Sequence, residues 1–198
     1  KMMVNLGTGS QVLYQMPTAN IAGTGFESRP GVLNGRFTTI THIPCGRALN
    51  VFAGFFDDCA TAAGGQPFFW RRFTSLSVEQ VLAADGNIDM NVFAAAWRYQ
   101  HGGAILNIHE GRFSLDTMLA TLAKSWLMQY VTAIDLLDPA RLQPTFLLGG
   151  GLCRRASFIL PVLEALTGRT GQTSESRIGE ETLDGMLALA QGVVDANQ

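Results

Sequence analysis

Two hydrophobic patterns alternate along this chain, and their order limits the folds that it can adopt. Residues 2–7 and 11–16 are short apolar runs separated by a glycine-containing stretch, and "GRFTTITHI" at 35–43 is rich in β-branched side chains. Short runs joined by a glycine turn are typical of a β-hairpin, and β-branched residues favour strands. We therefore expect a hairpin followed by a third strand.

The second pattern has the period of a helix. From Arg47 onward, apolar side chains recur every three or four residues, which predicts a helix with one buried stripe. The stripe consists of Ala48, Val51, Phe52, Phe55, Phe56 and Cys59. Similar patterns predict a long helix from the capping residue Ser114 to Asp138-Pro139, a helix at 156–168 and a last helix from about 180 to 194.

Strands therefore come first and then alternate with helices. "PTFLLGGG" at 144–151 predicts a buried strand that enters a glycine turn. Residues 62–112 interrupt the order, and we interpret them as an insertion with a short helix at "SVEQVLAA", a second at "MNVFAAAW" and a strand at "AILNI". This arrangement predicts one α/β domain with a mixed sheet flanked by helices.

The composition excludes several classes of partner. The net charge is −2 and no Lys/Arg-rich cluster is present, which argues against nucleic acid or an anionic membrane as partner. The three cysteines lack a CxxC pair, so neither a disulfide framework nor a zinc site is expected, and a reducing cytoplasm is the expected location. With 47% hydrophobic and only 15% charged residues, part of the surface is expected to be covered, by another domain or in a homodimer. Because Lys1 lies inside an apolar run, we expect the chain to be part of a longer protein.

Two glycine-rich turns follow predicted strands, one after the strand at 2–7 and one at the end of the strand in 144–151. Gly7-Thr8-Gly9-Ser10 could point several backbone N–H groups and two hydroxyls at a phosphate, although it matches neither the P-loop nor the Rossmann pattern. Gly149-Gly150-Gly151 leaves room for a ligand between a strand and a helix. Taken alone, Gly7-Thr8-Gly9-Ser10 is more typical of an ordinary hairpin turn than of a phosphate site, whereas Gly149-Gly150-Gly151 is as compatible with a tight strand-to-helix turn as with a ligand site. Gly46 stands at a predicted helix start, with the amide of Asn50 one turn later.

In this order, the glycine motifs resemble those of the C-terminal domain of the FGGY family of carbohydrate kinases, which belong to the actin-like ATPase superfamily. The resemblance covers about residues 2–61 and 113–196, and "GGGLCRRASFILPVLEAL" and "HIPCGRALNVFAGFFDD" are most similar to the sedoheptulose kinase branch. It implies a ribonuclease H-like, actin-like ATPase fold, with residues 1–198 as the C-terminal nucleotide-binding domain of a two-domain sugar kinase.

The resemblance also implies a set of ATP-binding residues. They are Gly7, Thr8, Gly9 and Ser10 at the β- and γ-phosphates, Gly46 and Asn50 beside the nucleotide, and Gly149, Gly150, Gly151 and Ser157 at the adenosine. Arg154 departs from the pattern, because many relatives carry Ser or Asn closer to the glycines. ATP would be used with Mg²⁺, for which the chain offers no ligand set of its own.

In this family the first phosphate loop, the sugar pocket and the catalytic Asp precede the "GTG" loop. We therefore expect no catalytic residue in this chain, the base upstream of Lys1, the sugar or polyol bound mainly by the missing domain, and no activity from these residues alone. Two alternatives remain open: a non-catalytic actin-like nucleotide-binding regulator, and an α/β binding domain whose glycine turns are only structural. Asp57 and Asp58 are interpreted as a solvated helix face rather than a carboxylate pair.

Overall fold

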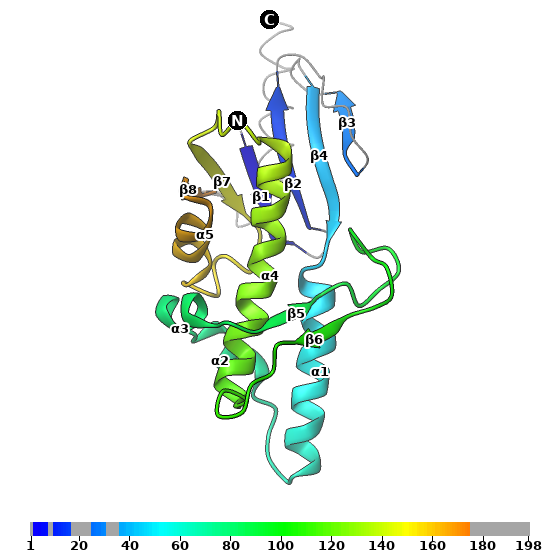
Figure 1. The fold of residues 1–198 in the computed structure, drawn as a ribbon, viewed down its shortest axis with the longest axis vertical. Helices are drawn as coiled ribbons and strands as arrows, with labels where there is room; N and C mark the ends of the chain where they lie inside the picture. Colours follow the sequence, from blue (N-terminus) through cyan, green and yellow to red (C-terminus); the bar gives the residue numbers. More distant parts are fainter. Residues whose placement is uncertain (1, 8–9, 17–24, 31–35, 175–198) are drawn as a thin grey trace, which may run out of the picture.

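The computed structural model describes residues 2–7, 10–16, 25–30 and 36–174 of the chain (Figure 1). Its strands are β1 (Met2–Asn5), β2 (Ser10–Met16), β3 (Glu27–Pro30), β4 (Arg36–Ile43), β5 (Asn87–Asp89), β6 (Ala104–Leu106), β7 (Thr145–Gly149) and β8 (Thr170–Thr173). Its helices are α1 (Gly46–Ala62), α2 (Phe69–Thr74), α3 (Val78–Ala83), α4 (Leu115–Leu137) and α5 (Ile159–Thr167).

The larger sheet has six described strands in the order β3-β4-β2-β1-β7-β8. β1 pairs antiparallel with β2, and β2 pairs antiparallel with β4. β1 pairs parallel with β7, which pairs parallel with β8. β1, β4, β7 and β8 therefore run in one direction, and their carboxyl ends lie at the same edge of the sheet.

Helix α4 covers one face of this sheet (Figure 1). Ser114 caps it as predicted, because its hydroxyl accepts a hydrogen bond from the Thr117 N–H at 3.2 Å. The helix contacts β2 and β4, and many of its side chains are buried, among them Trp126, Tyr130 and Ile134 at 0% exposure. At 23 residues it is the central helix of the domain. No helix within the described ranges is long and apolar enough to cross a membrane.

The carboxyl end of α4 is held by a buried ion pair. Asp138 and Arg169 are 2% and 5% exposed, and their side chains approach to 2.6 Å. Asp138 also accepts hydrogen bonds from the N–H groups of Leu142 and Gln143. Burial raises the pKa of Asp138, but the hydrogen bonds from Arg169, Gln143 and Leu142 outweigh it and leave this pKa below its usual value. The pair therefore fastens α4 to the start of β8.

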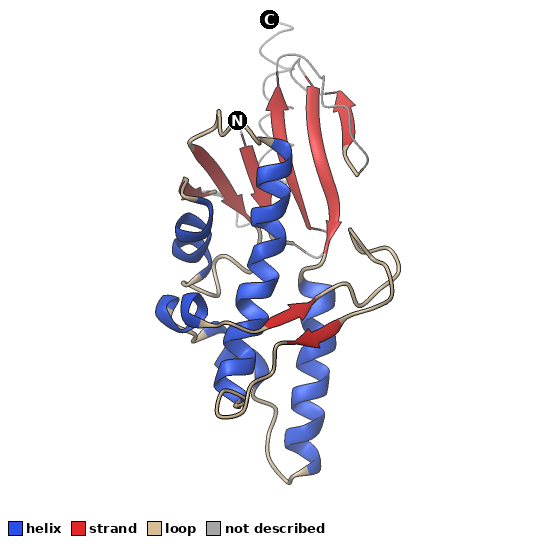
Figure 2. Cartoon of the chain, in the orientation of Figure 1, coloured by secondary structure: helices blue, strands red, loops and turns tan. Residues whose placement is uncertain are grey.

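Helix α1 begins at the edge where β1, β4 and β7 end, and extends away from the sheet (Figure 2). Its position corrects the predicted buried stripe, since Val51 and Phe55 are 53% and 62% exposed and Cys59 is exposed as well. The buried residues are Ala48, Leu49 and Ala53, near the sheet. The sequence period shows which side chains share a face, but it cannot show how far the neighbouring elements reach along it.

A series of aromatic contacts links α1 through α2 to the centre of the domain. Phe56 stacks on Phe69 at 5.9 Å between ring centroids, and Phe69 stacks on Phe73 at 5.3 Å. Phe73 in turn contacts Trp126 of α4 and Phe158 just before α5. Helix α2, which we did not predict, therefore owes its position to aromatic packing.

The remaining predictions divide by region. The hairpin, the strand at 36–43, the strand at 145–149 and the helices at 46–62 and 115–137 are confirmed. The helix expected at 156–168 begins three residues later, at Ile159, and ends at Gly168 with φ 64° as expected. Strand β3 was missed because "ESRP" is exposed throughout and carries no apolar signal. The helix expected from about 180 lies outside the described residues.

Region 62–112 contains α2, α3, β5 and β6. The short helix at "SVEQVLAA" and the strand at "AILNI" are confirmed as α3 and β6. The helix expected at "MNVFAAAW" is wrong, because residues 93–99 form turns. Tertiary contact decides this segment: the Trp97 N–H donates to the His42 carbonyl at 2.8 Å, and the Arg47 guanidinium lies over the Phe93 ring at 4.4 Å.

Candidate functional site

The glycine turns predicted to bind nucleotide lie at one edge of the sheet. Gly7 follows β1, Gly46 follows β4, and Gly150 follows β7. Since these strands run in the same direction, their carboxyl ends bring the turns together, although the turns are separated by about 40 and 100 residues in the sequence. We call Leu6, Gly7, Gly46 and Gly149–Gly151 the glycine edge.

Backbone contacts join the first and last of these turns directly. The Leu6 N–H donates to the Gly149 carbonyl at 2.8 Å, which continues the pairing of β1 with β7. Gly150 has φ +105°, and a Cβ atom added there would lie 2.5 Å from the Leu6 carbonyl oxygen. Only glycine permits this conformation and this approach. At Gly150, packing within the chain is a sufficient reason for glycine.

Gly46 behaves differently. A Cβ atom added there would meet only the Gly7 carbonyl oxygen, at 3.9 Å, which is ordinary van der Waals contact. The described chain would therefore accept a Cβ atom here, and the contact places Gly46 next to Gly7. Gly151 is exposed, and a Cβ atom there would meet nothing within 4 Å. Neither glycine is required by a steric clash of its Cβ position with the described chain.

The amino end of α1 also lies at the glycine edge. Cys45 is the N-cap residue, and its thiol makes no capping hydrogen bond among the described residues; the first turn contains no acidic side chain. The first N–H groups of a helix lack partners within the helix, and the helix dipole adds a partial positive charge. This end of α1 is therefore suited to an anionic group.

A buried polar cluster lies beneath the glycine edge. The Ser10 and Tyr130 hydroxyls approach to 2.5 Å, and both residues are almost fully buried. Cys45 is buried beside them; burial raises the pKa of its thiol and raises the pKa of the Tyr130 hydroxyl well above its ordinary value, so both are neutral near pH 7. Spacing in the sequence gave no signal for this cluster, because Ser10 and Tyr130 are 120 residues apart.

The cluster changes the interpretation of Ser10. Its hydroxyl, predicted to contact phosphate, forms a hydrogen bond with the Tyr130 hydroxyl, and the residue is only 2% exposed. Asn50 and Ser157 are exposed, Asn50 one turn into α1 and Ser157 two residues before α5. Thr8 and Gly9 lie outside the described residues. The structure thus brings together Gly7, Gly46 and Gly149–Gly151, and it gives Ser10 a structural contact.

The acidic side chain of Asp57 has a structural contact, and the described residues contain no group of metal ligands. The Asp57 carboxylate accepts the N–H groups of Phe68 and Phe69 at 2.7 and 2.9 Å, so it caps α2 instead of pointing to solvent as we expected. Across the part of the chain that the structure describes, no three His, Cys, Asp or Glu side chains gather closely enough to hold a metal ion.

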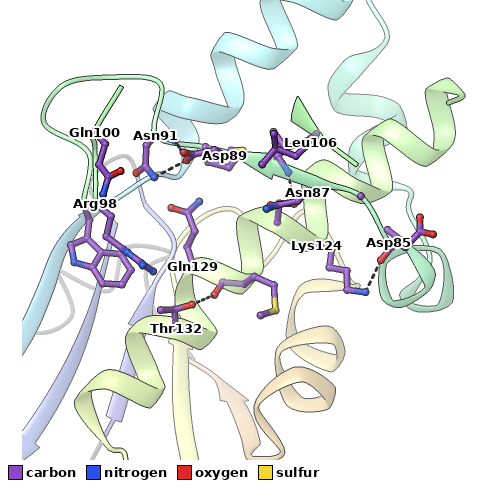
Figure 3. Close-up of a pocket in the computed structure, with 17 residues that line it drawn as sticks. Asp85, Asn87, Asp89, Asn91, Arg98, Gln100, Leu106, Lys124, Gln129 and Thr132 are labelled. Atoms are coloured by element: carbon purple, nitrogen blue, oxygen red, sulfur yellow. Dashed lines mark hydrogen bonds between the residues drawn. The ribbon is translucent and has the colours of Figure 1, made fainter. Parts of the chain in front are cut away.

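A separate pocket of about 660 Å³ lies between β5, β6 and the face of α4 turned away from the sheet (Figure 3). None of the residues of the glycine edge lines it. Its polar residues include Asp89, Asn91 and Arg98 from one segment and Gln129 from α4. We did not predict this pocket, because the positions of β5 and of residues 91–100 depend on tertiary contacts.

Comparison with solved structures places the fold among sugar kinases. The structure of gluconate kinase from Lactobacillus acidophilus matches the whole chain with a TM-score of 0.75 at 15% identity. Ligand-bound xylulose kinase from the same organism also matches the whole chain, with a TM-score of 0.73 at 15% identity. Xylulose kinase from Rhodospirillum rubrum matches 90% of the chain with a TM-score of 0.66 at 12% identity.

These matches confirm the predicted fold class, a mixed sheet flanked by helices like that of sugar kinases with the actin-like ATPase fold. The chain spans about two fifths of the two Lactobacillus kinases, 39% of each. No protein-family model and no curated sequence matches the chain. At identities of 15% or lower, the likeness describes the fold.

Proposed function

We propose that this chain supplies the nucleotide-binding half of an ATP-dependent sugar or polyol kinase. The observation that carries the proposal is the convergence of Gly7, Gly46 and Gly150 at one sheet edge, where α1 also begins. Backbone N–H groups and a helix start suit a polyphosphate, and residues without side chains let it approach the backbone closely. The kinase fold of the neighbours supports the same assignment.

In the proposed reaction, this chain binds and orients ATP. The phosphates lie against the start of α1 and Gly7, and the adenosine lies along Gly150 and Gly151. Mg²⁺ would be held by the phosphates of the nucleotide and would supply neutralisation of their charge, since the described residues offer no group of metal ligands. The acceptor hydroxyl and the base that takes its proton belong to a further domain, and closure of the two domains brings the hydroxyl in line with the γ-phosphate.

The structural alternative, in which the glycines serve packing only, explains Gly150 well. It does not explain Gly46, because a Cβ atom there would make only an ordinary van der Waals contact within the described chain. A ligand pressed against the start of α1 supplies the missing reason. Gly46 is therefore the position that best separates a nucleotide site from a purely structural turn.

The test is titration of the protein that contains this chain with ADP and Mg²⁺. Gly46→Ala is expected to weaken ADP binding by about tenfold, about 1.4 kcal/mol, while the melting temperature stays close to that of the parent. Gly54→Ala is the matched control on the same helix, where a Cβ atom meets nothing within 4 Å. Equal affinity for the two variants and the parent would contradict the nucleotide site at this edge. Nucleotide binding without phosphoryl transfer to any sugar or polyol would favour the regulator.

A further inference from the structure

One side chain of α4 links the two chain segments that flank Gly7 and Gly46. Tyr130 is fully buried, and its hydroxyl lies 2.5 Å from that of Ser10, the first residue of β2. The thiol of Cys45, the residue directly before α1, adjoins the same hydroxyl; burial and then this thiol raise the pKa of Tyr130. Ser10 is three residues after Gly7, and Cys45 directly precedes Gly46. Tyr130 is therefore the common neighbour of two segments that the proposed nucleotide site combines.

A β-bulge brings these two segments together. Ser10 pairs with Ile43, whereas Gln11 pairs with Thr41, so β4 has His42 as an extra residue at this point. His42 has φ 59°, in the left-handed region that residues other than glycine seldom adopt. The bulge therefore places the end of β4, and with it the start of α1, opposite the first residue of β2.

The three polar side chains of this buried cluster are too enclosed to contact a nucleotide. Ser10 and Cys45 are 2% exposed, and Tyr130 is 0% exposed. Burial raises the pKa of the Cys45 thiol, so the cluster is neutral near pH 7 and adds no charge beside the phosphates. Any influence on a ligand therefore passes through the position of the backbone, above all at Gly46, which lies next to the Gly7 carbonyl oxygen.

The packing of the Tyr130 ring does not require its hydroxyl. The ring meets Trp126 edge to face with centroids 6.0 Å apart, and a phenylalanine ring could make the same contact. Buried hydroxyls need a hydrogen-bond partner, so the Ser10–Tyr130 pair is favourable only while both side chains keep their positions. The pair therefore fixes the start of β2 relative to α4. Groups that bind an anion are most effective when their positions are fixed before it arrives.

We propose that Tyr130 is a positioning residue for the polyphosphate of the nucleotide. Its hydroxyl holds the start of β2 and the residue before α1 at one separation, so that the backbone at Gly7 and the amino end of α1 meet the phosphates together. This inference rests on the proposed nucleotide site, and it adds a buried side chain to a site otherwise made of glycines and a helix start.

The experiment measures the affinity of the protein that contains this chain for ADP with Mg²⁺, and records the ³¹P NMR signals of the bound nucleotide. Tyr130→Phe is expected to weaken binding about fivefold and to move the β-phosphate signal, because the backbone beside the phosphates is no longer held in one position. Tyr14→Phe is the matched control, since it removes a hydroxyl from another buried ring further along β2, where Tyr14 pairs with Met2 and Thr38. This control should bind ADP like the parent and leave the ³¹P signals in place.

A second variant, Ser10→Ala, tests whether the effect passes through the pair of hydroxyls. It is expected to weaken ADP binding as much as Tyr130→Phe does, and the double variant should bind no more weakly than either single one, because both changes remove the same contact. A side chain that only supports the fold would give losses that add, and would leave the ³¹P signals unmoved.

The inference is overturned if Tyr130→Phe binds ADP like the parent, if its β-phosphate signal stays in place, if Tyr14→Phe weakens binding as much, or if the losses add in the double variant. In each of these cases the parent binds ADP, and the proposed nucleotide site stands. A parent that binds no ADP contradicts the nucleotide site itself, and this inference with it.

Discussion

The six-stranded sheet with α4 and region 62–112 contain helices and strands alike, yet they are held together in different ways. In the sheet, long elements bury continuous apolar faces: α4 buries Trp126 and Tyr130 completely, and β1 contributes Val4 at 0% exposure. In region 62–112, the elements have three to six residues and are held by contacts with other elements, such as the aromatic packing of α2 and the Trp97–His42 hydrogen bond. Short helices and strands are stable only through contacts with neighbouring elements, whereas the buried face of a long element appears in the sequence as a regular hydrophobic period.

From this difference between the sheet and region 62–112, we expect substitutions at the glycine edge to lower the stability of the whole domain. Substitutions in region 62–112 should affect only the element that contains them. The largest expected effect is at Gly150. Gly150→Ala would place a Cβ atom 2.5 Å from the Leu6 carbonyl oxygen at φ +105°, so β1 and β7 would have to separate. We expect a loss of about 4 kcal/mol or more in the free energy of unfolding, measured by urea denaturation.

Gly151→Ala is the matched control for this substitution. The added methyl group would meet nothing within 4 Å, and the backbone of Gly151 is not in the left-handed region. Its free energy of unfolding should lie within about 0.5 kcal/mol of the parent. If both variants lost the same stability, the close approach of Gly150 to Leu6 would not be what holds this edge together.

The next largest effect concerns the buried Asp138–Arg169 ion pair at the carboxyl end of α4. Asp138→Asn leaves the buried Arg169 with only the more distant and half-exposed carboxylate of Asp135, at 3.9 Å, and we expect a loss of about 3 kcal/mol in the free energy of unfolding at pH 7. Asp116→Asn is the control, because its pair with Arg72 is exposed and surface pairs contribute about 0–1 kcal/mol.

This prediction has a pH dependence with a definite sign. The pKa of Asp138 is lowered in the folded protein, so its contribution is complete above the unfolded pKa of about 3.9 and is lost as the pH falls through the folded pKa. The difference between the parent and Asp138→Asn should therefore shrink below about pH 4. A difference that stayed constant down to acid unfolding would show that the charge of Asp138 is not what stabilises the pair.

The same contrast explains how much the sequence could reveal. The hairpin, β4, α4 and β7 were predictable because burial imposes a period of about two or 3.6 over several residues. The strand order then brought Gly7, Gly46 and Gly150 together, as the motif order implied. The Ser10–Tyr130 contact, the aromatic series to α2 and the pocket at Gln129 were not predictable, because they join residues that are distant in the sequence and show no period.

The smallest expected effect tests the local character of region 62–112. Asp57→Ala removes the acceptor of the Phe68 and Phe69 N–H groups, which should cost about 1 kcal/mol, whereas Asp58→Ala next to it is exposed and should cost almost nothing. Hydrogen exchange should show faster amide exchange in α2 and an unchanged rate in α4, since a lost cap frees one short helix first. Faster exchange throughout α4 would contradict this, and would mean that the Phe69–Phe73–Trp126 contacts couple α2 to the central helix as tightly as the sheet is coupled to it.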